Sequence, residues 1–306
     1  MAQKPVVQIE HLRKSYGDIR AVDDVSFEVP EGEIFGFVGP NGAGKTTTIE
    51  CAEGLRRPDG GLIRLFGLDP QAGGAKLKER LGIQLQEAAL PQHIKVWEAL
   101  DLFASFYPRP VDCPSLLEQM GLAEKRNASF VKLSGGQKQR LFIALALIND
   151  PDLIFLDELT TGLDPQSRHA MWDLVRGARN RGKTIILTTH FMEEAERLCD
   201  RVAIIDHGRM VALDTPERLI RSLGSGGRVV FSSLAAVDQA KLRALPGVIR
   251  VENSGERYTV HGANTKIVVD VVNFLSVNDI QFRDLRTEQA NLEDVFLAMT
   301  GREMRD

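Results

Sequence analysis

Hydrophobic and polar positions alternate along the first thirty residues of the chain. Residues 6–12 (VVQIEHL) and 21–29 (AVDDVSFEV) are short alternating runs that are rich in β-branched side chains. Such alternation is typical of strands with one buried face. The turn residues Tyr16-Gly17 stand between the two runs, so the pattern predicts an antiparallel pair.

Apolar runs without alternation follow, at 33–39 (EIFGFVG), 152–158 (DLIFLDE), 184–190 (TIILTTH) and 201–206 (RVAIID). Near-continuous apolar runs indicate strands buried on both faces, and helix-like patterns lie between them. The order predicts an α/β fold with a mostly parallel sheet covered by helices.

The middle of the chain, about 92–150, has helical periodicity instead. One stripe at helical spacing ends at Pro108-Arg109-Pro110, which we expect to stop the helix. We interpret the stripe as core packing; its members are Val96, Trp97, Leu100, Phe103, Ala104 and Tyr107.

A change of composition at 223–228 (LGSGGR) marks a linker. Beyond it the pattern reads strand, helix, strand, strand, helix, strand, helix, which suggests a small α+β sandwich of the ferredoxin-like kind. We therefore expect a first domain at 1–224 and an accessory α+β domain at 225–306.

Composition narrows the class of protein. The 306 residues are 43% hydrophobic and 26% charged, as in soluble globular proteins, and the net charge of −4 argues against nucleic acid as a partner. Cys51, Cys113 and Cys199 are scattered, which favours buried thiols in a reducing cytosol. No apolar run approaches the roughly eighteen residues of a membrane span, and the first twenty residues lack the apolar core of a signal peptide.

The stretch GPNGAGKTT (39–47) matches the phosphate-loop pattern GxxxxGK[ST], and it follows a predicted strand and precedes a predicted helix. The glycines allow backbone N–H groups to surround the phosphates, Lys45 would pair with the β- and γ-phosphates, and the Thr46 hydroxyl would bind Mg²⁺. We expect nucleotide contacts from Gly39, Asn41, Gly42, Gly44, Lys45, Thr46 and Thr47.

Two further strand ends carry candidate chemistry. Asp157 and Glu158 end the run LIFLDE; Asp157 would hold Mg²⁺ and Glu158 would polarise the attacking water. His190 ends TIILTTH, and in a parallel sheet its strand would bring it to the same phosphates as a γ-phosphate contact. HFMEEAE does not match the zinc pattern HExxH, so we assign no metal beyond Mg²⁺.

The stretch LSGGQKQR (133–140) is a second glycine loop before a helix, without a lysine placed for a phosphate. Together with the phosphate loop, LIFLDELTTGLDP and TTH, in this order, it resembles the nucleotide-binding subunit of an ABC transporter from residue 5 to about 220. The resemblance implies bound ATP and a P-loop NTPase sheet with an antiparallel β subdomain and a helical subdomain at about 87–150.

The same resemblance assigns further residues. It implies that Tyr16 stacks on adenine, that Gln86 senses Mg²⁺ and touches the membrane partner, with Gln84 as a rival, and that Asp164 links two nucleotide sites. It also implies γ-phosphate contacts from the signature loop Ser134, Gly135 and Gly136. Leu159 departs from the family, which commonly has proline there, and the change is expected to loosen the following loop.

The C-terminal LEDVFLAMTGREMRD and the run EIFGFVGPNGAGKTTTIE resemble ATP-binding subunits of ABC-2-type exporters, including those of daunorubicin-resistance type. This resemblance implies an ATPase on the inner face of the cell membrane, working with a separate integral membrane permease that docks between Gln86 and Leu133.

The alternative is a soluble ABC ATPase of translation or DNA repair; the single set of motifs, without a coiled-coil insertion, argues against it. A P-loop kinase or GTPase would not contain LSGGQKQR.

The two glycine loops are explained if they serve the same ATP from different chains. The phosphate loop of one subunit would hold the phosphates, and Ser134 with its helix terminus in a second copy would cover the γ-phosphate. The sequence therefore predicts a head-to-tail homodimer with two composite sites. Lys138 and Arg140 would serve the helix surface. The accessory domain fits a dimer-stabilising or regulatory module, with ligand sensing as the alternative.

Overall fold

The computed structural model describes residues 5–85, 89–223, 227–235, 237–264 and 266–301. These residues fall into two compact units, divided between Pro216 and Glu217. The division lies N-terminal to the predicted linker at 223–228.

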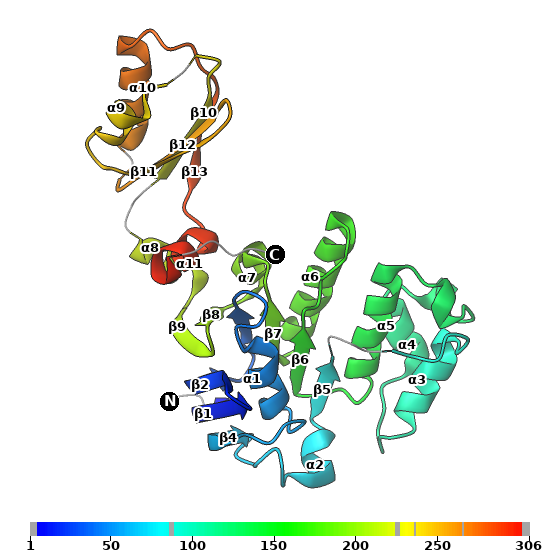
Figure 1. The fold of residues 1–306 in the computed structure, drawn as a ribbon. Helices are drawn as coiled ribbons and strands as arrows, with labels where there is room; N and C mark the ends of the chain where they lie inside the picture. Colours follow the sequence, from blue (N-terminus) through cyan, green and yellow to red (C-terminus); the bar gives the residue numbers. More distant parts are fainter. Residues whose placement is uncertain (1–4, 86–88, 224–226, 236, 265, 302–306) are drawn as a thin grey trace. The chain divides into compact units, whose positions relative to one another are not determined.

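A six-stranded sheet forms the centre of the first unit, in the order β5-β6-β7-β3-β8-β9. All neighbouring strands are parallel except the antiparallel pair β8–β9, which confirms the predicted α/β architecture (Figure 1). Every residue of β3, β6 and β7 is buried, as their continuous apolar runs predicted. The bounds are β3 Ile34–Val38, β5 Leu81–Gln84, β6 Leu153–Asp157, β7 Thr184–Thr189, β8 Arg201–Asp206 and β9 Arg209–Asp214.

A second, antiparallel sheet of three strands has the order β2-β1-β4. Its strands are β1 Pro5–Tyr16, β2 Ile19–Pro30 and β4 Gly60–Leu65. Tyr16 pairs with Ile19, which confirms the predicted hairpin. The alternating burial of β2, with Val25, Phe27 and Val29 turned inward, is the pattern that the sequence shows.

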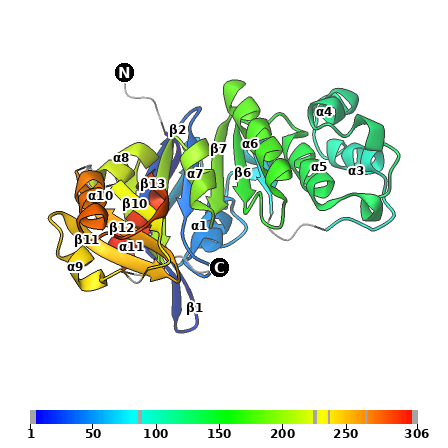
Figure 2. The ribbon, with the colours of Figure 1, turned by 90° about the horizontal axis from the view of Figure 1, so that it is seen from above.

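Helices connect these strands. α1 Lys45–Ala52 follows β3, α2 Gly74–Lys78 precedes β5, α6 Pro165–Asn180 lies between β6 and β7, and α7 Met192–Leu198 lies between β7 and β8. α3 Val96–Ala104, α4 Cys113–Gln119 and α5 Gly135–Leu147 lie side by side at one end of the unit (Figures 1 and 2). Short 3₁₀ turns at Ala123–Lys125 and Phe130–Lys132 join α4 to α5.

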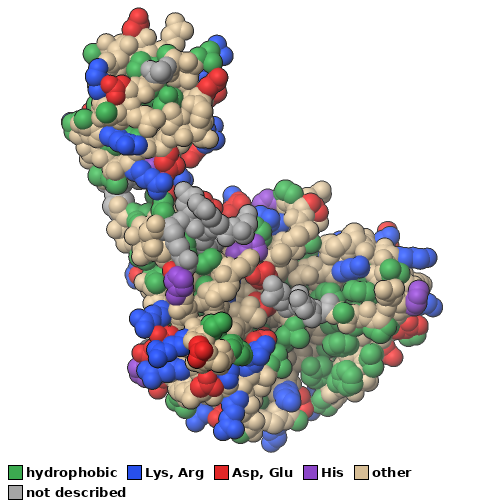
Figure 3. All heavy atoms as spheres, viewed as in Figure 1, with side chains coloured by type: hydrophobic (Ala, Val, Ile, Leu, Met, Phe, Trp, Pro, Cys, Tyr) green, Lys and Arg blue, Asp and Glu red, His purple; other side chains and the backbone are tan. Residues whose placement is uncertain are grey.

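The predicted stripe on α3 is only partly core. Val96 and Leu100 are fully buried, whereas Trp97 and Phe103 are half-buried. The helix ends at Ala104 and not at the prolines: the Ser105 N–H still bonds to the Asp101 carbonyl, whereas the Phe106 and Tyr107 N–H groups bond only three residues back, as in a tightened last turn. Apolar side chains gather on the surface over this helical segment (Figure 3), and Leu102 and Phe106 are 46% and 67% exposed.

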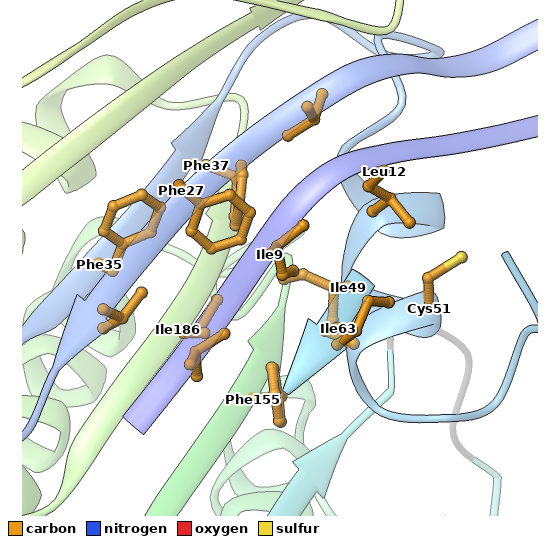
Figure 4. Close-up of a cluster of buried hydrophobic side chains, with 14 of the residues drawn as sticks. Ile9, Leu12, Phe27, Phe35, Phe37, Ile49, Cys51, Ile63, Phe155 and Ile186 are labelled. Atoms are coloured by element: carbon orange, nitrogen blue, oxygen red, sulfur yellow. The ribbon is translucent and has the colours of Figure 1, made fainter. Parts of the chain in front are cut away.

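The main core of the first unit lies between the two sheets and α1. Phe27 from β2 stacks on Phe35 from β3 with ring centroids 5.1 Å apart, and Phe37 meets Phe27 edge-on at 4.9 Å (Figure 4). Ile9 and Ile49 join them from β1 and α1. The core therefore fixes β3 and α1, the two elements that carry the phosphate loop between them.

The second unit has its own sheet, in the order β11-β12-β10-β13, with every neighbouring pair antiparallel. Its chain order βαββαβ confirms the predicted ferredoxin-like arrangement. Phe231 and Tyr258 stack at 5.2 Å within a separate core under α9 and α10. The elements are α8 Pro216–Ser222, β10 Gly227–Ser232, α9 Gln239–Arg243, β11 Val248–Ser254, β12 Arg257–Gly262, α10 Ile267–Val277, β13 Arg283–Gln289 and α11 Leu292–Thr300.

Cys51, Cys113 and Cys199 are free thiols; Cys51 and Cys199 are buried, as predicted, whereas Cys113 is only half-buried. Among the helices of the described ranges, none combines the length and the apolar character that a membrane span requires.

Candidate active site

The phosphate loop joins the buried strand β3 to α1, and two of its glycines have no room for a side chain. A Cβ on Gly39 would lie 2.2 Å from the Ile205 carbonyl oxygen, and one on Gly44 would lie 2.1 Å from that of Ala21. Gly44 caps α1 with a φ of 102°, in the left-handed region that favours glycine. The loop therefore places the N-terminus of α1 at the end of β3, the geometry that binds a phosphate.

Lys45 is held inside this loop. Its Nζ donates to the carbonyl oxygens of Gly39 at 2.7 Å and Pro40 at 3.0 Å, and the side chain is 4% exposed. Burial lowers the pKa of Lys45, and the nearby carboxylates of Glu158 and Asp157 oppose that change. An ammonium has three protons, so one donor is left for a phosphate oxygen.

Thr46 and Asp157 form the expected pair of hard oxygen ligands. The Thr46 hydroxyl, on α1, donates at 3.4 Å to Oδ1 of Asp157, the last residue of β6. Burial raises the pKa of Asp157, whereas hydrogen bonds from Thr188 and Thr46 act in the opposite direction. Mg²⁺ at nucleotide sites is usually held by one or two protein oxygens together with phosphates and water, so these two groups fit it.

The described ranges contain no cluster of three or more His, Cys, Asp or Glu side chains that could hold a metal ion.

Thr188 connects the Asp157 carboxylate to the backbone of Glu158, and no motif in the sequence selects it. Its hydroxyl donates to Asp157 Oδ1 and accepts a hydrogen bond from the Glu158 N–H at 3.0 Å. Its position could have indicated this role: Thr188 lies two residues before His190, on strand β7, which pairs with β6.

The backbone of Glu158 has an unusual conformation, which sets the direction of its side chain. Its φ is 50°, in the left-handed region, where non-glycine residues are uncommon and cost about 1–3 kcal/mol. The Thr161 hydroxyl donates to Oε2 at 3.1 Å, and His190 Nδ1 lies 3.5 Å from Oε1. Strands β6 and β7 thus bring the predicted base and the predicted histidine together.

A further carboxyl lies behind this cluster. Glu53 follows α1, is 7% exposed, and neither carboxyl oxygen has a hydrogen-bond partner among the described residues. Burial, and then the negative charge of Asp157, raise the pKa of Glu53 to about 9. At neutral pH it is therefore a neutral acid and adds no charge beside Asp157.

The signature loop is pre-formed as a helix start. Ser134 caps α5: its hydroxyl accepts from the Gln137 N–H at 3.3 Å, and the Gln137 side chain accepts from the Ser134 N–H at 3.0 Å. Around Gly135 there is open space, whereas a Cβ on Gly136 would lie 2.9 Å from the Ser167 hydroxyl. As predicted, the basic residues serve the helix surface: Lys138 lies over the Phe130 ring and Arg140 donates to the Gly136 carbonyl.

Asp164 caps the next helix, α6. Its carboxylate accepts from the Ser167 N–H at 3.0 Å and from the Ser167 hydroxyl at 2.6 Å, and these bonds lower the pKa of Asp164. Ser167 thereby joins the start of the signature helix to the loop that follows Glu158.

Sheet order separates the signature loop from the phosphate loop of the same chain. α5 packs on β5, where the Ala146 carbonyl leaves no room for a side chain at Gly82. β5 lies three strand positions from β3, and strands are spaced about 4.8 Å, so the strand on which α5 packs is about 14 Å from the strand that leads into the phosphate loop. Within one chain, one cluster lies around the phosphate loop: Lys45, Thr46, Asp157, Glu158 and His190. The other predicted nucleotide contacts lie at the starts of α5 and α6: Ser134, Gly135, Gly136 and Asp164.

Four further residues singled out from the sequence are Tyr16, Gln86, Gln84 and Leu159. Tyr16 ends β1 and is 40% exposed, with Lys14 and Arg56 within 5.6 Å and 5.4 Å of its ring centroid. Gln86 lies outside the described residues. Its rival Gln84 ends β5, is 4% exposed, and donates to the Leu85 carbonyl at 2.7 Å. Leu159, where the family commonly has proline, is 1% exposed, so its side chain packs in the interior.

Comparison with known proteins places this site in a family. The model of the ABC transporter family matches residues 22–161. The Nod factor export ATP-binding protein I of Ralstonia nicotianae is 42% identical over 99% of this chain and 96% of its own, and that of Paraburkholderia xenovorans is 43% identical over 98% of each.

Solved structures agree. An ATP-binding subunit of an ABC transporter superposes with a TM-score of 0.64 at 29% identity, covering 71% of this chain and 92% of that one. The dimeric bacterial ABC transporter cassette MJ0796 gives 0.61 at 25% identity, covering 68% and 98%. With the phosphate loop, carboxylate pair and capped signature helix in place, the chain belongs to the ABC transporter family and is an ATP-binding, ATP-hydrolysing subunit of that family.

Proposed function

We propose that this chain drives export: two copies close on two Mg-ATP molecules, and hydrolysis reopens them to move a separate membrane permease. One observation supports export as the direction of transport. Relatives named for export align over 98–99% of the chain, so they share the second unit, whereas the cassette structures cover 68–72%, about the extent of the first unit.

Hydrolysis is assigned to groups that the first unit brings together. Lys45 and the N–H groups around Gly42 and Gly44 would bind the phosphates, and Thr46 and Asp157 would hold Mg²⁺. The bound ion would neutralise charge on the β- and γ-phosphates. Glu158 then accepts a proton from the attacking water, and His190, 3.5 Å from its Oε1, holds the γ-phosphate in line with that water.

The dimer completes each site. Ser134 and Gly136 of the second copy supply N–H groups and a helix terminus to the γ-phosphate, because the sheet order keeps these residues away from the phosphate loop of their own chain. The dimeric state of the MJ0796 cassette supports this arrangement.

The permease would dock on the helical segment between residues 86 and 133. Its exposed apolar side chains include Leu102, Phe106 and Val131, and Figure 3 shows apolar side chains gathered over this part of the surface. Contiguous exposed apolar patches of this kind commonly mark protein interaction sites. The subunit would then lie on the inner face of the cell membrane without crossing it.

Co-expression with an ABC-2-type permease from the same genome tests the proposal. We expect the chain to sediment with membranes only when that protein is present, and inverted vesicles to take up its substrate when ATP is added. Phe106→Asp should release the chain into the supernatant while its ATP binding stays intact. Equal membrane recovery with and without the permease would contradict the proposal.

A further inference from the structure

Glu194 is a buried carboxylate that the mechanism above does not use. It lies in the first turn of α7 and is 1% exposed, whereas its neighbour Glu193 is 56% exposed at the side chain and pairs with Arg197 on the surface. A buried carboxylate is costly unless it is hydrogen-bonded, so its partners indicate what it does.

The contacts of Glu194 come from three different elements of the active site. Trp172 Nε1, on the helix that Asp164 caps, donates to Oε1 at 3.0 Å. Burial raises the pKa of Glu194, and the hydroxyls of Thr189 and Thr160, together with the Trp172 N–H, oppose this change. Thr189 directly precedes His190, and Thr160 lies two residues after Glu158.

Not all polar atoms around Glu194 are hydrogen-bonded. Glu194 Oε2 and the Thr160 hydroxyl are both buried, and neither has a hydrogen-bond partner of ordinary geometry among the described residues. Because the Thr160 hydroxyl also acts on the Glu194 carboxyl, a donor and an acceptor without partners lie near one another. A small shift of the loop 158–164 pairs them and satisfies both.

We propose that Glu194 is a positioning residue that couples three parts of the site: the loop bearing Glu158 and Asp164, the strand end bearing His190, and α6. When the Thr160 hydroxyl bonds to Oε2, the loop is fixed with Glu158 and His190 in register. Arg168 also faces Glu194, with its guanidinium over the Phe191 ring at 4.3 Å, and its positive charge favours the ionised form of the carboxyl, against the effect of burial.

This inference rests on the proposed role of Glu158 as the base. A double-mutant cycle tests it: Glu194→Gln, Thr160→Val and the combined variant, with Glu193→Gln as the matched surface control. We expect each single change to lower kcat about tenfold, the worth of one buried hydrogen bond, with the KM for ATP unchanged. The combined variant should be no slower than the slower single variant, because both changes break the same bond.

Three outcomes would overturn the inference: an unchanged kcat in Thr160→Val, losses that multiply in the combined variant, or an equal loss in Glu193→Gln. A fall in Tm of Glu194→Gln without any loss in Thr160→Val would show a purely structural role and also overturn it. Glu158→Gln assayed in parallel keeps the two proposals apart. If that variant retained turnover, the proposed base would fail, while the cycle would still measure the coupling of Thr160 to Glu194.

Discussion

Glu158→Gln should lower ATP turnover by about 10²–10⁴-fold, the usual contribution of a general base, while ATP still binds. The amide keeps the size of the side chain and can still accept the hydrogen bond from the Thr161 hydroxyl, so the left-handed backbone at Glu158 should be retained. Only the capacity to accept a proton from water is lost. The dimer should then persist with ATP, because hydrolysis no longer reopens it.

Steady-state phosphate release and size-exclusion chromatography with ATP and Mg²⁺ measure the two effects. Glu193→Gln makes the same chemical change on the surface of α7 and serves as the control. Turnover at the normal rate in Glu158→Gln would show that another group accepts the proton.

Lys45→Ala should weaken ATP binding itself, by about 10–100-fold, because charge-assisted hydrogen bonds contribute about 1.5–3 kcal/mol. The substitution also leaves the carbonyls of Gly39 and Pro40 without their donor, so the loop loses part of its support. Titration calorimetry with ATP and Mg²⁺ gives the change in Kd.

The matched control for Lys45→Ala is Lys183→Ala, since Lys183 pairs with Asp150 at the surface and lies outside the site. If ATP bound both variants equally well, Lys45 would have no part in holding the phosphates.

The sequence predicted the part of the fold whose pattern is unambiguous. β3, β6 and β7 are buried on both faces, and their continuous apolar runs have no other simple interpretation. β4 and β5 were not predicted. β4 begins with Gly60-Gly61, and β5 has only four residues and needs a glycine because α5 approaches its backbone, so neither shows a strand-like pattern.

The site was predictable where a motif fixes both residue and position, as for Lys45, Thr46, Asp157 and Glu158. Thr188 and Glu194 were not, because their roles depend on neighbours from other elements. The run MEEAE shows two adjacent glutamates, and only the fold decides that Glu194 is buried while Glu193 is exposed.

The composite site is the central claim, and the distribution of two changes between two subunits tests it most directly. In the first mixed pair one subunit carries Lys45→Ala and the other Ser134→Arg; in the second pair one subunit carries both changes and its partner neither. All subunits carry Glu158→Gln to trap ATP, and two different affinity tags isolate the mixed pair. The readout is the amount of ATP retained per pair.

If the phosphate loop of one subunit works with the signature loop of the other, the first pair keeps one intact site and retains ATP, and the second pair keeps none. If each chain builds its own site, the second pair retains ATP through its unchanged subunit and the first pair loses it. We predict retention in the first pair alone; retention in the second pair alone would contradict the composite site.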